Sequence, residues 1–261
     1  MKETIYHGFP VFLALLSDLH NRPFAPVIAS LRSHAPSLIC ITGDILYGAA
    51  PVEDQTPLET QKNVLPFLSA CSAIAPTYLS LGNHEWMLDC TDIKEIEKTG
   101  VIVLDNNWVT TVVDGKDVAL AGLTSGYVMD YRAFRATTGG SVRYPKKEGL
   151  SGISDVRTKH KPETAWLSEF SSQPGYKVLL CHHPCYLPLI PTEVDLVLAG
   201  HAHGGQWRVF GRGVWSPGQG WWPRYTKGVY ENRLVVSAGL SNTTWVPRIF
   251  NETEVVYLES P

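Results

Sequence analysis

The chain has 261 residues, 44% of them hydrophobic and 18% charged, and its formal net charge is −3. This composition excludes an intrinsically disordered chain, and the acidic balance argues against a general nucleic-acid binder. No linker rich in Pro, Gly or Ser divides the sequence, so we expect residues 1–261 to form a single domain.

The longest uninterrupted apolar run covers residues 11–16, whereas a transmembrane helix needs roughly 20 such residues. The run is also short for the core of a signal peptide, and Lys2 followed by Glu3 is a poor flank for one. We therefore expect a cytoplasmic protein without a transmembrane segment.

Short apolar runs bounded by turn residues predict buried strands. The runs cover residues 11–16, 38–41, 77–81, 101–104, 118–122, 177–180, 195–199 and 233–238. Helices are predicted over residues 24–34, 57–74 and 89–99, and a fourth begins near Pro162. Asp114-Gly115 predicts a hairpin. This alternation indicates an α/β domain with at least some parallel sheet.

Polar side chains follow five of the predicted strands. The segments are SDLH (17–20), TGD (42–44), LGNHE (81–85), LCHHP (180–184) and AGHAHGGQ (199–206). Because the carboxyl ends of parallel strands share one edge of a sheet, we expect these segments to build a common site.

Asp, Asn and His without Cys suit manganese foremost, with iron or zinc as alternatives. Asp18 and His20 flank one residue, as do His201 and His203, so in extended backbone each pair points to one side. The potential ligands exceed what one ion takes, and two divalent ions sharing a carboxylate would use them all. They are Asp18, His20, Asp44, Asn83, His182, His201 and His203.

The order of these five segments resembles the calcineurin-like metallophosphoesterases, and the GHAHGGQ form resembles a bacterial single-domain branch of that family. The resemblance runs from Ser17 to Gln206. It implies a four-layer α/β fold, in which two facing mixed β-sheets are flanked by helices and a two-metal site lies at the strand ends.

The resemblance also implies roles for individual residues. The first metal would be held by Asp18, His20 and His203, the second by Asn83, His182 and His201, and both by Asp44. A hydroxide bridging the ions would attack phosphorus, because bound metal lowers the pKa of water. His84 would be the catalytic histidine that assists the leaving group, with Asp44 as the bridging carboxylate.

Three further residues near these motifs keep two interpretations each. His183 is either an outer group of the site or a packing residue. Arg248 either binds the phosphate of the substrate or forms a surface salt bridge. Glu85 either orients His84 or caps a following helix.

Two other segments bear on the substrate. Residues 124–161 carry many Lys and Arg and lack periodicity, which fits either a solvated loop or a flap over an anionic substrate. The segment WSPGQGWWPRY (215–225) brings Trp221 and Trp222 together. These rings either pack in the core or lie exposed, lining the mouth of the site or contacting lipid peripherally.

The function expected from these patterns is metal-dependent hydrolysis of a small anionic phosphomonoester, phosphodiester or pyrophosphate. Two alternatives stay open. One is a non-catalytic scaffold that keeps the phosphoesterase fold. The other is a nuclease of the same family, which the net acidity disfavours.

Overall fold

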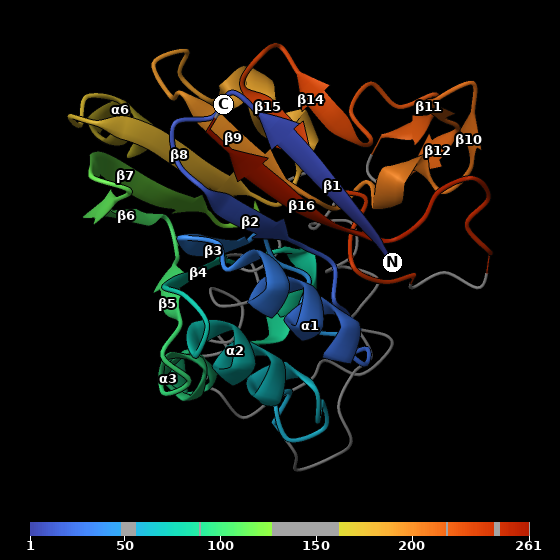
Figure 1. Ribbon diagram of the computed structural model, residues 1–261, viewed down its shortest axis with the longest axis horizontal. Coiled ribbons are helices and arrows are strands. Elements are labelled where there is room, and N and C mark those ends of the chain that lie inside the picture. Colours follow the sequence, from blue (N-terminus) through green and yellow to red (C-terminus); the bar gives the residue numbers. More distant parts are fainter. Residues whose placement is uncertain (48–55, 89, 127–161, 218, 243–245, 261) are drawn as a thin grey trace, which may run out of the picture.

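The computed structural model describes residues 1–47, 56–88, 90–126, 162–217, 219–242 and 246–260. Two six-stranded sheets dominate it (Figure 1), in the strand orders β1-β16-β2-β3-β4-β5 and β14-β15-β9-β8-β7-β6. Strands β2 to β5 are parallel, whereas β16 runs antiparallel to β2. In the second sheet β15, β9, β8 and β7 are parallel, and the edge strands β14 and β6 are antiparallel. Both sheets are therefore mixed.

The first sheet contains β1 Lys2–His7, β2 Leu13–Leu16, β3 Leu38–Ile41, β4 Thr77–Ser80, β5 Ile102–Leu104 and β16 Glu254–Glu259. The second contains β6 Asn107–Val113, β7 Lys116–Leu123, β8 Tyr176–Cys181, β9 Leu196–Ala199, β14 Gly228–Tyr230 and β15 Leu234–Val236. Two small hairpins pair β10 Arg208–Val209 with β11 Arg212–Gly213, and β12 Trp215–Ser216 with β13 Gly220–Trp221. The helices are α1 Ala25–His34, α2 Val64–Ser72, α3 Cys90–Glu97 and α6 Leu167–Ser171, and short 3-10 helices are η1 Asn83–Met87, η2 Pro184–Leu189 and η3 His203–Gly205.

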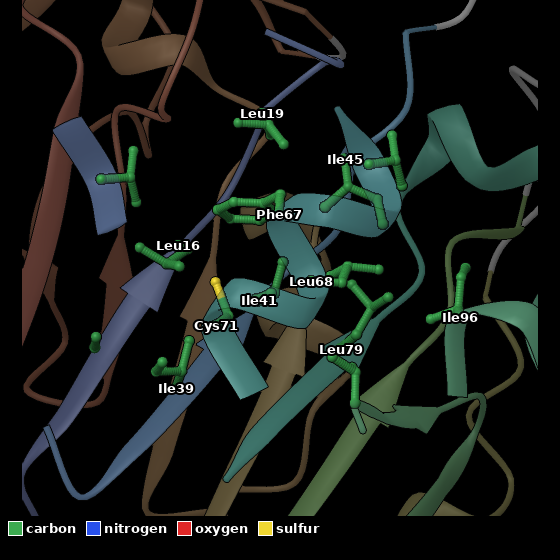
Figure 2. Packing of buried hydrophobic residues seen from close by; sticks show 14 of the residues in the cluster. Leu16, Leu19, Ile39, Ile41, Ile45, Phe67, Leu68, Cys71, Leu79 and Ile96 are labelled. Carbon is green, nitrogen blue, oxygen red and sulfur yellow. The ribbon is translucent and has the colours of Figure 1, made fainter. Parts of the chain in front are cut away.

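The sheets face each other because their central strands are apolar on both faces. In β2, Leu13 and Leu15 join the core between the sheets, while Ala14 and Leu16 pack under the helices. Figure 2 shows the helical side, where Phe67 of α2 covers the first sheet. On the outer face of the second sheet lie residues of α6 and η2. This is the predicted arrangement of two facing mixed sheets flanked by helices.

The structure corrects several predicted elements. Strands β1 and β16 were not predicted. β1 is hard to recognise because it is an edge strand whose side chains alternate between exposed and half-buried. The helix predicted over residues 57–74 is confined to Val64–Ser72, because turns occupy the residues before it. The fourth helix comprises only Leu167–Ser171. Most of the segment 124–161, from residue 127 onward, lies outside the described residues. Among those described, no helix has the length and apolarity that crossing a membrane requires.

Candidate metal centre

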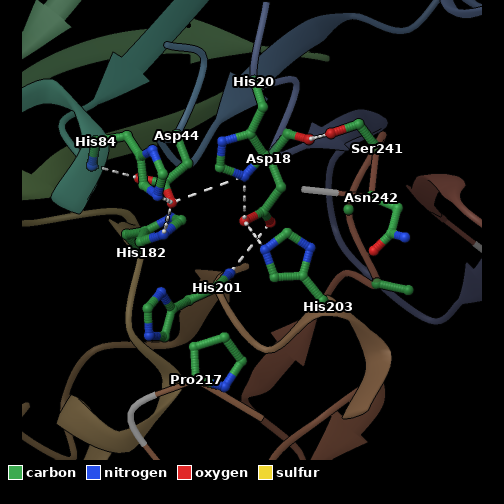
Figure 3. Close-up of polar contacts among 12 residues, drawn as sticks. Asp18, His20, Asp44, His84, His182, His201, His203, Pro217, Ser241 and Asn242 are labelled. Atoms are coloured by element: carbon green, nitrogen blue, oxygen red, sulfur yellow. Dashed lines mark hydrogen bonds and ion pairs between the residues drawn. The ribbon is translucent and has the colours of Figure 1, made fainter. Parts of the chain in front are cut away.

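Five loops at the carboxyl ends of parallel strands meet at one edge of the two sheets. Figure 3 shows the histidines and aspartates of these loops facing a common centre. The loop after β2 carries Asp18 and His20, and the loop after β3 carries Asp44. The remaining candidates follow β4, β8 and β9: Asn83, His84, His182, His201 and His203. Both sheets thus contribute side chains to one site.

The candidate ligand atoms lie within a few ångströms of one another. Asp18 Oδ1 is 3.6 Å from His20 Nε2 and 3.5 Å from His203 Nε2. Asp44 Oδ2 is 3.0 Å from His182 Nε2 and 3.9 Å from His20 Nε2. Three groups have the geometry to hold an ion: Asp18 with His20 and His203, Asp44 with His182 and His201, and a third that combines His20, Asp44 and His84.

Several atoms that face this centre are buried without a hydrogen-bond partner among the described residues. They are Asp18 Oδ1, His20 Nε2 and His182 Nε2, and Asn83 Oδ1 in the loop after β4 is also buried without such a partner. The other ring nitrogens are already engaged: His20 Nδ1 donates to the Leu46 carbonyl at 3.1 Å and His182 Nδ1 to the Thr42 carbonyl at 2.7 Å. These bonds leave the Nε2 lone pairs toward the centre, the usual orientation of a histidine ligand. Unpartnered buried oxygen and nitrogen atoms of this kind fit bound cations.

The backbone of these loops is left-handed instead of extended, which corrects the expectation for the two Xaa-x-His pairs. Asp18 and His20 have φ of 57° and 50°, and His201 and His203 have φ of 62° and 45°. Asp18 and His20 still converge on one candidate ion, but His201 and His203 belong to different groups. Tight turning of the chain, and not strand alternation, brings the side chains together.

Close contacts between loops hold this backbone in place. Asp44 has φ of 53°, and the preceding Gly43 has φ of 94°. A Cβ added to Gly43 would lie 2.4 Å from the Gly82 backbone nitrogen, so only glycine permits the two loops to approach this closely. The His84 N–H donates to Asp44 Oδ1 at 2.8 Å, which fixes the orientation of that carboxylate.

The electrostatics of the site favour ionised carboxylates beside two neutral imidazoles, those of His201 and His203, and one protonated imidazole, that of His182. Burial opposes ionisation of Asp44, but His182 and His84 hold its pKa well below the ordinary value. Burial lowers the pKa of His201 to about 3 and that of His203 to about 4, so both are neutral at pH 7. Burial also opposes protonation of His182, but Asp44 raises its pKa to about 9. A cation at His182 Nε2 would therefore displace a proton.

The profile of the calcineurin-like phosphoesterases matches residues 13–205, which include all five loops. The chain belongs to the calcineurin-like phosphoesterase family. It is accordingly a metal-dependent phosphohydrolase, and the family assigned from the sequence motifs is confirmed.

This phosphoesterase is similar to several curated proteins over nearly its whole length. It is 25% identical to the uncharacterized protein YpbG of Bacillus subtilis (strain 168), covering 97% of this chain and 82% of that protein. It is 24% identical to the uncharacterized metallophosphoesterase YkuE of the same organism, covering 97% of this chain and 80% of the relative. A solved 5'-nucleotidase precursor from Thermus thermophilus is 17% identical, with a TM-score of 0.48, over 77% of this chain and 43% of that one.

Glu85 of the phosphoesterase clamps the loops that carry the candidate ligands. Its Oε1 accepts the backbone N–H groups of Ile45 and Leu46 at 2.9 and 3.1 Å. Its Oε2 accepts those of Asp44 and Gly82 at 2.8 and 2.7 Å. The bond from the Gly82 N–H caps η1, which is one of the two roles expected for Glu85. The other three bonds tie the Glu85 carboxylate to the loop after β3. Burial and the charge of Asp44 raise the pKa of Glu85 to about 7.

We expect Glu85→Gln to lower the free energy of unfolding by about 1–3 kcal/mol, because the amide nitrogen of Gln would face two backbone N–H donors. Urea denaturation of the wild type and the variant measures this difference. Glu97→Gln, an exposed position at the end of α3, is the matched control and should unfold like the wild type. Equal stability of all three proteins would contradict the clamp.

His84 lies on the open side of the site. Its Nε2 is 3.7 Å from Asp44 Oδ2, and 27% of its side chain is exposed, whereas the Asp44 side chain is almost fully buried. The ring meets that of His20 edge-on, with 4.6 Å between centroids. His84 is therefore the most exposed histidine of the site.

His183 lies behind the candidate ligands. Its Nε2 is 3.1 Å from Ser125 Oγ, and its ring is 4.1 Å from that of His201, centroid to centroid. Burial holds the pKa of His183 well below its ordinary value. These contacts fit both the packing role and an outer role that orients His201.

Arg248 contacts the candidate metal centre through hydrogen bonds, and not through the surface salt bridge considered above. Its guanidinium donates to the Ala238 carbonyl at 2.7 Å and to the Ser241 carbonyl. Nη2 also lies 3.1 Å from His203 Nδ1. Arg248 thus ties the loop after β15 to the segment that carries His203. Its contact with substrate stays a prediction.

Aromatic side chains beyond Gln206 divide between core and surface. Tyr225 is buried, as core packing predicts, but Trp221 and Trp222 expose 66% and 67% of their surface. Core packing is therefore wrong for these two tryptophans. The structure adds two exposed aromatic residues that were not singled out in the sequence, Phe210 and Phe250. A lone Phe in a loop carries no pattern that distinguishes it from a buried one.

Proposed function

We propose that this protein hydrolyses a small phosphomonoester, phosphodiester or pyrophosphate with two divalent ions, manganese foremost. The observation that carries the proposal is the set of buried ligand-type atoms without partners that face one centre. Such atoms are costly in a folded protein unless a ligand satisfies them. A donor set of carboxylate, amide and imidazole suits manganese, iron or zinc.

We assign the first ion to the group of Asp18, His20 and His203. The second falls to His182 and His201, with Asn83 adding its buried Oδ1. Asp44 lies near both groups, since its Oδ2 is 3.0 Å from His182 Nε2 and 3.9 Å from His20 Nε2. It is the carboxylate suited to contact both ions.

When bound, two divalent ions would supply a water-derived nucleophile at neutral pH and neutralise charge on the phosphoryl oxygens. Asp44 keeps its carboxylate ionised, and the His84 N–H fixes the direction in which that carboxylate points. The His84 ring stands at the open side of the site, and burial lowers its pKa, so the neutral ring can donate a hydrogen bond from Nε2–H to the departing oxygen. The buried loops exclude bulk water behind the substrate.

The scaffold alternative receives less support than catalysis. A scaffold does not need the candidate ligands, yet every one of them is present and near the centre. The nuclease alternative depended on the basic residues between 132 and 161, and that segment lies outside the described residues. Phosphoester hydrolysis of a small substrate is therefore the function that the site supports best.

Metal analysis of the purified protein combined with a substrate panel tests this proposal. We expect about two equivalents of divalent metal per chain, and turnover of aryl phosphomonoesters, diesters or pyrophosphates that EDTA abolishes and Mn²⁺ restores. DNA and RNA in the same panel test the nuclease alternative. A folded protein that takes up no divalent ion, or that turns over no phosphoester when loaded, would overturn the proposal.

A further inference from the structure

Four aromatic side chains extend into solvent around the two small hairpins β10–β11 and β12–β13. Phe210 is fully exposed, and Phe250, Trp222 and Trp221 expose 89%, 67% and 66% of their surface. Val209 and Ile249 beside them are also exposed. A large exposed apolar surface of this kind marks an interaction site more often than chance exposure.

The backbone conformation of three of these residues makes their identity unexpected. Phe210, Trp222 and Phe250 have φ of 49°, 56° and 52°, the left-handed region that Gly and Asn occupy more easily. In the turn between β10 and β11, Phe210 precedes Gly211, where an Asn-Gly pair would cost less. Neither packing nor backbone preference explains an aromatic residue at these positions. Outliers of this kind point to a function outside the fold.

Backbone hydrogen bonds bring the segments that carry these residues close together. The backbone N–H of Arg208 donates to the Ile249 carbonyl at 3.0 Å. Arg208 lies two residues before Phe210, and Ile249 directly precedes Phe250. The Trp222 N–H donates to the Val214 carbonyl at 2.8 Å, directly after β11. Figure 1 shows β10, β11 and β12 together at one end of the molecule, away from β6.

A basic cavity of about 510 Å³ lies beside Trp222. Trp222 lines it together with Arg208, Arg212, Arg224 and Lys227, and no acidic residue is part of its described wall. Arg224 pairs with Glu231 and Lys227 with Glu254, whereas Arg212 is exposed and has no ion pair among the described residues. The local surface is therefore cationic although the chain is acidic as a whole.

We propose that this surface docks on an anionic lipid bilayer, with Phe210, Phe250 and Trp222 inserted at the interface and the cavity facing the headgroups. Exposed aromatic rings beside arginines match the interfacial region of a bilayer, where rings enter the acyl boundary and cations meet anionic headgroups. This charge complementarity favours lipid over a second copy of the chain, which would bring like charges together. Docking does not depend on the proposed hydrolysis.

The docking surface is connected directly to the metal centre. Arg208 Nη1 donates to the Gly204 carbonyl at 2.8 Å, and Asn251 Nδ2 donates to the His203 carbonyl at 2.7 Å. Figure 3 shows Pro217, between β12 and β13, facing His201 and His203. A bilayer on this surface would therefore lie close to the segment that carries His203.

Co-sedimentation with phosphatidylglycerol–phosphatidylcholine vesicles tests the proposal. We expect the wild type to bind these vesicles. The double variant Phe210→Asn/Phe250→Asn should bind them at least about tenfold more weakly. Asn tolerates left-handed backbone, so the double variant should fold, as circular dichroism would verify. Val112→Thr removes an exposed apolar side chain from β6 and should bind like the wild type. Arg212→Glu should weaken binding, as should vesicles of phosphatidylcholine alone.

Failure of the wild type to bind anionic vesicles would overturn the proposal, and so would equal binding by the folded double variant. Sedimentation velocity without lipid provides a separate outcome. A concentration-dependent dimer that Phe210→Asn/Phe250→Asn abolishes would assign the surface to self-association instead. Metal content and phosphoester turnover of the double variant, measured in solution, should equal those of the wild type, so failure of docking and failure of the proposed function are distinguishable.

Discussion

Asp44→Asn should lower phosphoester turnover by at least about a thousandfold and reduce the divalent metal bound per chain. The amide keeps the size of the carboxylate and can still accept the His84 N–H. However, the amide nitrogen of Asn would take the place of Asp44 Oδ2, which lies 3.0 Å from His182 Nε2, and this nitrogen carries no negative charge. An amide nitrogen can only donate, so it cannot bind a cation. Turnover of an aryl phosphate and metal content by mass spectrometry measure the two effects.

Asp117→Asn supplies the matched control, because Asp117 is exposed at the start of β7, far along the strand from the site. Its turnover and metal content should equal those of the wild type. Retention of full turnover by a folded Asp44→Asn protein would contradict the assignment of Asp44 to both ions.

His84→Ala should lower turnover by about a hundredfold to ten-thousandfold while metal content stays at the wild-type level. The reason is the position of His84 at the open side of the site: it also forms a group with His20 and Asp44, but we assign the ions to the other two groups. Its loss should matter most for esters with poor leaving groups, because a good leaving group departs without a proton. Rates with p-nitrophenyl and alkyl phosphates therefore separate the two roles.

His7→Ala is the corresponding control. His7 is exposed on β1 and pairs with Glu259, and both residues lie at the end of the sheet opposite the site. It should turn over both classes of ester like the wild type. If His84→Ala lost the bound metal, or slowed both esters by the same factor, His84 would act on the ions and not on the leaving group.

The buried strands were the part of the fold that the sequence predicted best. Runs such as residues 38–41 and 196–199 are apolar on both faces because a sheet covers each of them on one side and a helical layer on the other. β1 could not be found this way. It has one half-covered face at the edge of the sheet, and its partner β16 lies more than two hundred residues away in the sequence.

In the site, the sequence predicted which residues meet but not how the backbone brings them together. The five junctions do share one edge, because strand direction alone carries each loop there. The left-handed conformation of Asp18 and His201 follows from contacts between loops, which local spacing does not encode. The clamp by Glu85 is equally non-local, joining a residue after β4 to N–H groups after β3.

The position of β16 has a consequence for biosynthesis. Val256, Tyr257 and Leu258 pair with β2, which pairs on its other side with β3, so β2 finds its second neighbour only after the ribosome has translated nearly all of the described chain. Until then a nascent chain would expose an unpaired, fully apolar edge at Leu13–Leu16, the kind of edge that promotes aggregation. Completion of the first sheet thus depends on residues 254–259, and shortening the chain before residue 254 should yield misfolded protein instead of a weaker enzyme.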